Sequence, residues 1–224
     1  MNRPTFGHAW SSSVGQKVLV GLTGLFLCTF LIVHLSGNLL LFKNDGGRAF
    51  EEYAKFMSTN PAIRLMEIVL TAGFAGHIFF GVRVWLHNRR ARPERYATNR
   101  PSENSSLASR TMFASGSIVF VFLVVHLKTF FVPSRFPGAV PPSMFKLVAQ
   151  AFASPVYDAF YLLSLALIGF HLRQGFQSAF LTLGLRPARR TLIDSVAVIF
   201  WLIIPIGYAT MPLYFLWAHL TVAK

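Results

Sequence analysis

The sequence predicts an all-α integral membrane bundle of five transmembrane helices. Of its 224 residues, 54% are hydrophobic and only 13% are charged, and the mean hydropathy is +0.51. A soluble domain carries roughly 25% charged residues, so this composition lies well outside that class. The chain also contains 23 Phe and 16 Gly, and Gly is commoner in membrane helices than in soluble ones. No linker is long or polar enough to divide the chain, so we expect a single domain over residues 1–224.

Five apolar stretches are close to the length of about 20 residues that a helix needs to cross a bilayer. They cover about residues 17–42, 62–87, 107–131, 156–183 and 192–220. Pro205 and Pro212 fall in the last stretch, where neighbouring helices can satisfy the backbone groups that proline leaves free. Two shorter amphipathic segments, residues 50–57 and 144–152, predict helices that lie at the membrane interface.

Lys and Arg predict the orientation. The net charge of +13 would also suit a nucleic-acid-binding protein, but the basic residues gather in loops and at the ends of the stretches. The N-terminal tail and the loops after the second and fourth stretches hold most of them, while Asp45, Glu51 and Glu52 offset part of the charge on the opposite side. By the positive-inside rule the N-terminus lies in the cytoplasm and the C-terminus outside. We expect a multi-pass protein of the bacterial cytoplasmic (inner) membrane, surrounded by lipid and not bound to nucleic acid.

Four of the seven histidines lie well inside consecutive stretches: His34, His77, His126 and His171. A single histidine at such depth can simply be hydrogen-bonded to a neighbouring helix, but ionisable groups there are costly and usually functional. At a rise of about 1.5 Å per residue, His34 and His126 lie near the outer surface, and His77 and His171 lie about 10 Å closer to the cytoplasm. Two pairs at two heights are what two stacked haems need, because each iron takes one imidazole nitrogen on either face. We predict that these residues ligate two haems b.

Several further residues are placed where they could surround the porphyrins. Small or polar residues lie four positions from a histidine, on its helix face: Asn38, Gly73, Gly81 and Gly175. Candidate partners for the haem propionates lie near the ligand depths: Arg83, Lys128 and Arg173. Close helix packing is the alternative role for the glycines, and snorkelling to the lipid headgroups is the alternative for the cations.

Zinc binding, covalent haem attachment and proton transport fit four buried histidines less well. A zinc site would need histidines four residues apart on one helix, or carboxylates at the same depth, and the sequence has neither. Covalent haem attachment needs a C-x-x-C-H motif, and Cys28 is the only cysteine. The cytochrome b of bc complexes takes two ligands from each of two helices, whereas here each helix supplies one.

A haem-free transporter with a histidine proton relay is the alternative from a different class. Against it, no stretch carries a buried acid beside the histidines, because Glu67 and Asp194 lie close to the ends of their stretches.

Four short runs resemble one known family. They are Ser-Val-Gly-Gln-Lys at 13–17, His-Leu-Ser-Gly-Asn-Leu at 34–39, Gly-His-Ile-Phe-Phe-Gly at 76–81 and His-Leu-Arg-Gln-Gly at 171–175. In order and spacing they resemble the five-helix, di-haem cytochrome b anchor of succinate dehydrogenases and fumarate reductases (complex II), the b558 family. The resemblance covers nearly the whole chain. In one respect the chain departs from some members, which carry a glutamate two residues before the last haem ligand, where this chain has Gly169.

The resemblance implies a role in electron transport and in the tricarboxylic acid cycle. It implies that His34 and His126 hold the distal haem, and that His77 and His171 hold the proximal haem. A flavoprotein subunit and an iron–sulfur subunit would dock on the cytoplasmic face, and electrons would pass between them and a membrane quinone, expected to be menaquinone. The chain has no dinucleotide fingerprint, cysteine cluster or flavin attachment motif, so the dicarboxylate chemistry would belong to those partners and no catalytic residue is assigned here.

The quinone site and the exact enzyme stay open. A site near the outer haem would use Lys43, Glu51 or Glu52, where an acid takes protons from the quinol. A site near the iron–sulfur subunit would use Ser13 and Lys17. Ordinary polarity at helix ends is the alternative for each of these residues. A haem b anchor of a hydrogenase or a formate dehydrogenase is the alternative enzyme.

Overall fold

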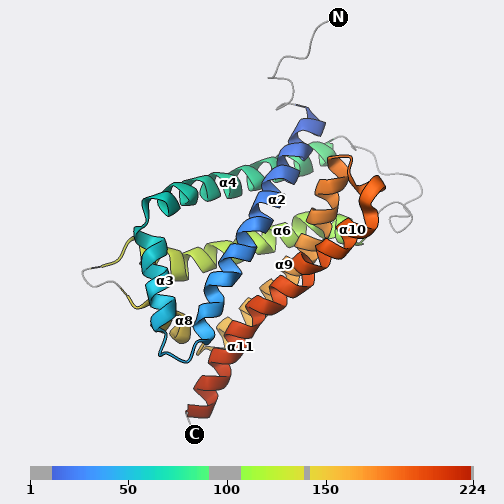
Figure 1. Cartoon of the computed structure of the whole chain (residues 1–224). Helices are drawn as coiled ribbons and strands as arrows, with labels where there is room; N and C mark the ends of the chain where they lie inside the picture. The colour runs from blue at the N-terminus through green and yellow to red at the C-terminus, as the bar shows by residue number, and fades with distance from the viewer. Residues whose placement is uncertain (1–11, 91–106, 139–141, 223–224) are drawn as a thin grey trace, which may run out of the picture.

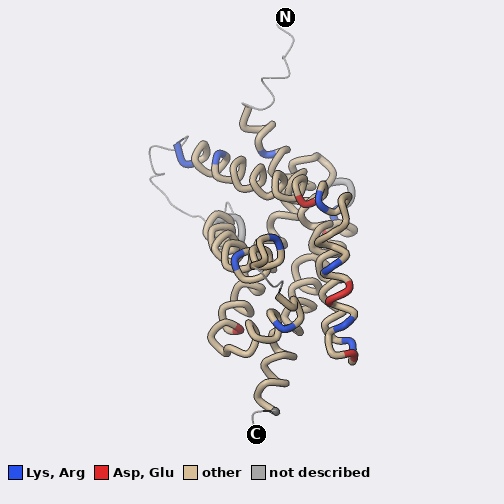
Figure 2. Tube along the Cα trace, turned by 90° about the vertical axis from the view of Figure 1, so that its left-hand side faces the viewer, with Lys and Arg blue, Asp and Glu red and all other residues tan. Residues whose placement is uncertain are grey.

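The computed structural model describes residues 12–90, 107–138 and 142–222, and the regular structure within these ranges is helical (Figure 1). Five helices in this part are long and apolar enough to cross a membrane, which confirms the predicted number. They cover Ser13–Phe42, Pro61–Arg90, Thr111–Arg135, Pro155–Thr182 and Arg190–Thr221, within a few residues of the predicted stretches. Charged residues are sparse along the trace (Figure 2), as expected of a multi-pass membrane protein.

Short helices and turns link or interrupt the long ones. In chain order the elements are α2 (Ser13–Asn38), the 3-10 turn η1 (Leu39–Phe42), α3 (Arg48–Thr59), α4 (Pro61–Arg90), α6 (Leu107–His126), the π turn η2 (Leu127–Phe131), α7 (Val132–Arg135), α8 (Met144–Ala151), α9 (Pro155–Thr182), α10 (Arg186–Val198), the π turn η3 (Ile199–Ile203) and α11 (Ile204–Val222). Serines cap three of these helices: the side chains of Ser12, Ser143 and Ser154 each accept a hydrogen bond from a backbone N–H three residues on.

Helix α2 is central, and it packs along α4 on one side and α9 on the other. Helices α6 and α11 also pack along α9. The buried side chains form two clusters, one around Leu41, Tyr161 and Phe215 and the other around Cys28 and Phe200. Helix α4 contributes no buried residue to either cluster.

The two segments predicted to be interfacial are helices, α3 and α8. Each buries apolar side chains in the cluster around Leu41, namely Phe50 from α3 and Val148 from α8. The Glu51 carboxylate joins the two helices, because it accepts a hydrogen bond from the Phe145 N–H at 2.8 Å and another from the Ser143 hydroxyl. Glu51 thereby sits at the N-terminus of α8, where a carboxylate is favoured.

Both π turns end two residues before a proline, Pro133 and Pro205. Proline has no N–H to donate and crowds the carbonyl four residues before it, and a wider turn relieves that crowding. For Pro205 the carbonyl in question belongs to Trp201. A Cβ atom added to Gly169 of α9 would lie only 2.6 Å from the Trp201 oxygen. Helix α9 therefore approaches this carbonyl because residue 169 has no side chain.

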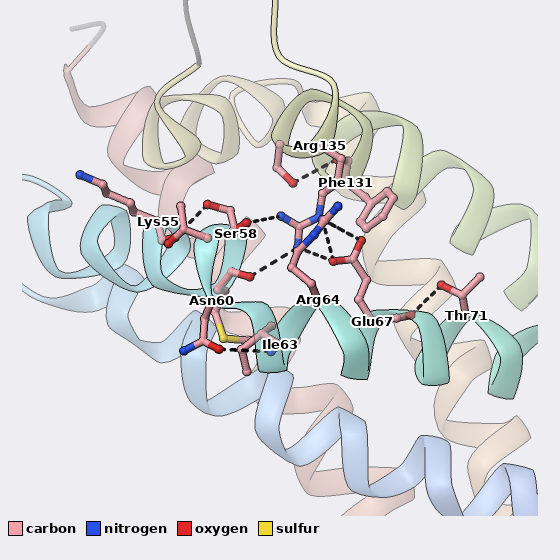
Figure 3. Close-up of polar contacts among 12 residues, drawn as sticks. Lys55, Ser58, Asn60, Ile63, Arg64, Glu67, Thr71, Phe131 and Arg135 are labelled. Carbon is pink, nitrogen blue, oxygen red and sulfur yellow. Dashed lines mark hydrogen bonds and ion pairs between the residues drawn. The ribbon is translucent and has the colours of Figure 1, made fainter.

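Helices α3, α4 and α7 meet at a cluster of charged side chains (Figure 3). The Arg135 guanidinium donates to both oxygens of Glu67, at 2.9 Å from Nε to Oε1, and to the carbonyls of Ser58 and Met57 at 3.2 and 3.4 Å. Arg64 also reaches Glu67, at 3.1 Å. The side chains of Arg135 and Glu67 are only 11% and 19% exposed, so this ion pair is shielded from solvent, whereas Arg64 is 50% exposed.

Candidate functional site

The four histidines come together as two pairs, each built from two helices. His34 of α2 lies beside His126, the last residue of α6, with ring centroids 5.8 Å apart and ring planes at 88°. His77 of α4 lies beside His171 of α9, with centroids 6.3 Å apart and planes at 82°. These are the pairs expected from helical depth. That the rings ligate iron stays a prediction.

The spacing within each pair suits two imidazoles on opposite faces of one metal ion. With metal–nitrogen bonds of about 2.0 Å and a ring centre about 1.1 Å beyond each nitrogen, the two centroids would lie about 6.2 Å apart. The observed separations of 5.8 and 6.3 Å are close to this value. Aromatic rings in simple contact also lie about 4.5–7 Å apart, so the hydrogen bonds of the rings are the more specific observation.

The His77 ring is held from α2 through Nδ1. This nitrogen lies 3.2 Å from the Val20 carbonyl oxygen and 3.3 Å from the Thr23 hydroxyl. The Thr23 hydroxyl donates its own hydrogen to the Leu19 carbonyl at 2.7 Å, so it can only accept from the ring. Nδ1 is therefore the protonated nitrogen, and the lone pair of the neutral ring is on Nε2, the form that binds a metal.

The His171 ring is held from α6 in the same way. Its Nδ1 lies 3.4 Å from the Ser115 hydroxyl, and that hydroxyl donates to the Met112 carbonyl at 3.0 Å. Because this hydroxyl donates to a carbonyl, it is placed to accept from Nδ1–H, an arrangement that favours a lone pair on Nε2. Gly24 and Gly116, which follow Thr23 and Ser115, also face these rings. A Cβ atom at either glycine would lie 3.2 Å from the Cε1 atom of the histidine.

In the outer pair, His126 is the better-held ring. Its Nδ1 lies 2.6 Å from the Tyr161 hydroxyl, and the ring stacks on Phe122 at 5.7 Å. His34 stacks on Phe30 at 5.1 Å. Both phenylalanines lie four residues before their histidine, on the same helix face.

Asn38 contacts His34 as predicted from the spacing, but mainly through the backbone. Its amide nitrogen donates to the His34 carbonyl at 2.7 Å and lies 3.5 Å from Nδ1. An amide N–H could only donate to Nδ1, so this long contact does not favour a proton on Nδ1 of His34.

The polar contacts of the four rings within the described ranges run through Nδ1, so these contacts leave Nε2 unengaged, and they favour a lone pair on Nε2 in the inner pair. No group of three or more His, Cys, Asp or Glu side chains forms a metal site within those ranges. A pair of imidazoles suits a metal that brings its own equatorial ligands, and haem iron does so with four porphyrin nitrogens. The residues present therefore fit a haem in each pair.

The predicted glycines have different surroundings. A Cβ atom on Gly73 would lie 2.8 Å from the Phe26 ring, so Gly73 allows α2 and α4 to pack closely, which was the alternative role. A Cβ atom on Gly175 would make ordinary contact with Met112 at 3.4 Å, and one on Gly81 would meet no atom within 4 Å. Gly81 alone of the three thus borders open space.

The predicted cations are exposed. Arg83 lies 5.6 Å from the Phe79 ring centre, and Arg173 lies 5.1 Å from that of Trp201. Lys128 is exposed in the π turn that follows His126. Contact of these side chains with haem propionates stays a prediction.

Among the residues predicted for quinone binding, Lys17, Lys43 and Glu52 are exposed, and Ser13 is the first residue of α2. Glu51 is engaged with the N-terminus of α8. The structure does not gather these side chains into one site, so their role in quinone binding stays a prediction.

The structure contains a buried acid that the sequence analysis did not identify. Asp158, in the first turn of α9, is only 1% exposed. Neither of its carboxylate oxygens has a hydrogen-bond partner in the described part of the chain, and the same holds for the Tyr157 hydroxyl. Asp158 lies one helical turn before Tyr161, which contacts His126. No local sequence pattern marks this burial, which comes from tertiary packing.

Thr23, Gly24, Ser115 and Gly116 are site residues that were not predicted from the sequence. The signal for them is an internal repeat. Residues 23–35 read TGLFLCTFLIVHL and residues 115–127 read SGSIVFVFLVVHL, with Gly, Phe, Leu, Val, His and Leu at matching positions. In both segments a Ser or Thr followed by Gly precedes the outer histidine at the same distance. A comparison of the spans with one another would have found this pattern.

Comparison of the chain with protein-family models, with curated proteins and with solved structures finds no match.

Proposed function

We propose that this chain is the membrane-anchor cytochrome b subunit of a succinate:quinone oxidoreductase, with two bis-histidine haems b. The observation that carries the proposal is the pairing of four histidines from four helices at 5.8 and 6.3 Å, with the Nδ1 atoms of the inner pair held as donors. The order and spacing of the four sequence runs support the choice of enzyme.

Each residue of the site has a defined task in this proposal. His34 and His126 would hold the outer haem, and His77 and His171 the inner one, through their Nε2 atoms. A bound haem b would supply one-electron transfer. The side chains of the chain orient the imidazoles: hydroxyls at Nδ1 select the ligating tautomer, and stacked phenylalanines limit rotation of the outer rings.

The partners and the orientation belong to the same proposal. A flavoprotein and an iron–sulfur subunit would dock on the cytoplasmic face, to which the proposed orientation assigns the basic segment 91–106; that segment is outside the described residues. The inner haem would then be nearer to the iron–sulfur subunit, and the outer haem nearer to the far side of the membrane. A membrane quinone, menaquinone by expectation, would complete the path for electrons.

The proposal is tested by haem content. The purified chain should give two haems b per polypeptide by pyridine haemochrome, with a dithionite-reduced minus oxidised spectrum of a b-type cytochrome. Alanine in place of any of the four histidines should remove one haem, whereas alanine at His219, near the end of α11, should remove none. A folded protein without haem would refute the cytochrome and favour the transporter.

A second measurement separates the candidate enzymes. Membranes solubilised mildly should yield the chain together with a protein that carries covalent flavin, and the complex should reduce fumarate with quinol. Copurified nickel or molybdenum in place of flavin would assign the chain to a hydrogenase or a formate dehydrogenase.

A further inference from the structure

We propose that Thr23–Gly24 of α2 and Ser115–Gly116 of α6 are two copies of one positioning device, each of which seats one histidine of the inner pair. Thr23–Gly24 seats His77 of α4, and Ser115–Gly116 seats His171 of α9. The device sets the tautomer, orientation and ligand strength of the inner histidines and leaves the outer pair unaffected. This inference rests on the proposed function, because it concerns how the inner haem is held.

The hydroxyl of each copy has only one role open to it toward the ring. Thr23 and Ser115 each donate their single hydrogen to a carbonyl of their own helix, at 2.7 and 3.0 Å. Toward Nδ1, at 3.3 and 3.4 Å, each therefore offers a lone pair. Accepting from Nδ1–H raises the basicity of the opposite nitrogen, which makes Nε2 a stronger ligand.

The glycine of each copy sets how close the ring comes to the helix. A Cβ atom at Gly24 or Gly116 would lie 3.2 Å from Cε1 and 3.5 or 3.6 Å from Nδ1 of the histidine it faces. The two distances are nearly the same in the two copies. An alanine at either position would crowd the ring and disturb its contact with the neighbouring hydroxyl.

The spacing places each device on the same side as an outer ligand. Thr23 precedes His34 by eleven residues, and Ser115 precedes His126 by eleven (34 − 23 and 126 − 115). Eleven residues are about three turns and about 16 Å of helix, so device and ligand share one face at two depths. Helices α2 and α6 thus each carry one outer histidine and also contact an inner histidine that belongs to another helix.

The two copies differ in the number of acceptors near Nδ1 of the histidine. His77 has a second acceptor, the Val20 carbonyl at 3.2 Å, whereas Ser115 is the one acceptor that His171 has within the described residues. Loss of the Thr23 hydroxyl leaves Nδ1–H of His77 with a partner. Loss of the Ser115 hydroxyl leaves Nδ1–H of His171 without one. Ser115→Ala should therefore perturb the inner haem more than Thr23→Val.

The experiment uses the full chain with its haems and redox titration of each haem. To identify the inner haem, the titration is repeated in the His126→Ala background, which retains only that site. We expect Ser115→Ala to raise the midpoint potential of the inner haem, because a weaker ligand stabilises the oxidised iron less, and to change its low-spin EPR signal. Haem affinity at that site should fall about 10- to 100-fold. Thr23→Val should shift the same haem less.

Two kinds of control keep the test specific. Ser115→Thr and Thr23→Ser retain the hydroxyl and should behave like the natural chain. Thr29→Val and Ser117→Ala remove exposed hydroxyls that bond only to backbone carbonyls of the same helices, and should leave both haems unchanged. If Ser115→Ala does not fold, Gly24→Ala and Gly116→Ala are titrated instead, with the same expected upward shift confined to the inner haem.

The outcomes separate the two proposals. A natural chain without haem refutes the proposed function. A natural chain with two haems whose inner potential and EPR signal are the same in the Ser115→Ala, Thr23→Val and glycine variants refutes the positioning device alone. A shift of the outer haem in these variants would refute it as well.

Discussion

Arg135 should contribute far more to stability than Arg64, although both contact Glu67. Breaking a fully buried ion pair costs about 3–5 kcal/mol, whereas an exposed pair is worth about 0–1 kcal/mol. Arg135 is 11% exposed and makes four hydrogen bonds, two to Glu67 and two to backbone carbonyls that end α3. We therefore expect Arg135→Ala to cost about 2–3 kcal/mol, between these limits. Arg64→Ala should cost at most about 1 kcal/mol, because Arg64 is half exposed.

The assay is unfolding of the purified chain in detergent micelles, followed by circular dichroism, with Arg64→Ala as the matched control. A double-mutant cycle with Glu67→Gln should give a coupling of about 1–3 kcal/mol for Arg135 and less than about 0.5 kcal/mol for Arg64. Arg135→Lys should not restore stability, since lysine lacks the planar fork that reaches both carboxylate oxygens. Equal losses for Arg135→Ala and Arg64→Ala would refute the argument from burial.

Three further predictions concern the interior of the bundle. Gly169→Ala should destabilise the chain by about 1–3 kcal/mol, because its Cβ would meet the Trp201 carbonyl at 2.6 Å; an unchanged melting temperature would contradict this contact. Tyr161→Phe removes the 2.6 Å contact with His126, and in the proposed cytochrome it should shift the midpoint potential of the outer haem only; a redox titration in which the inner haem shifts instead would contradict the prediction. Asp158→Asn should change stability by less than about 1 kcal/mol, because the carboxylate has no partner to lose within the described residues; a loss above about 2 kcal/mol in the same unfolding assay would show that a partner exists.

The long helices were predictable because the bilayer imposes their length, and hydropathy alone located them to within a few residues. Helices α3 and α8 followed from amphipathic patterns. The contacts between these helices could not be predicted from hydropathy or amphipathic patterns. Arg135 and Glu67 are 68 residues apart, and nothing local links them. The two π turns required both a proline and knowledge of what packs beside it, as Gly169 does beside Trp201.

The pairing of the histidines was predictable for a different reason. The rise of a helix is constant, so a residue count from the membrane surface gives depth, and depth sorted His34 with His126 and His77 with His171. Depth carries no information about rotation around the helix axis. Which nitrogen of each ring is free depends on that rotation and on the neighbouring helix, and the hydroxyls of Thr23 and Ser115 became visible as partners only with side chains in place.

The internal repeat explains why α2 and α6 make equivalent contacts with the histidines of both pairs. His34 and His126 occupy the same position in segments 23–35 and 115–127, so each outer ring meets a phenylalanine four residues before it. Because the same segments carry the Ser/Thr–Gly pairs, a helix that supplies an outer histidine also holds an inner one. A substitution that rotates α2 or α6 would then disturb both levels, whereas one that rotates α4, which carries His77 alone, would disturb the inner level first. This asymmetry follows from which helix carries the device, and it makes α2 and α6 the structural frame of the whole site.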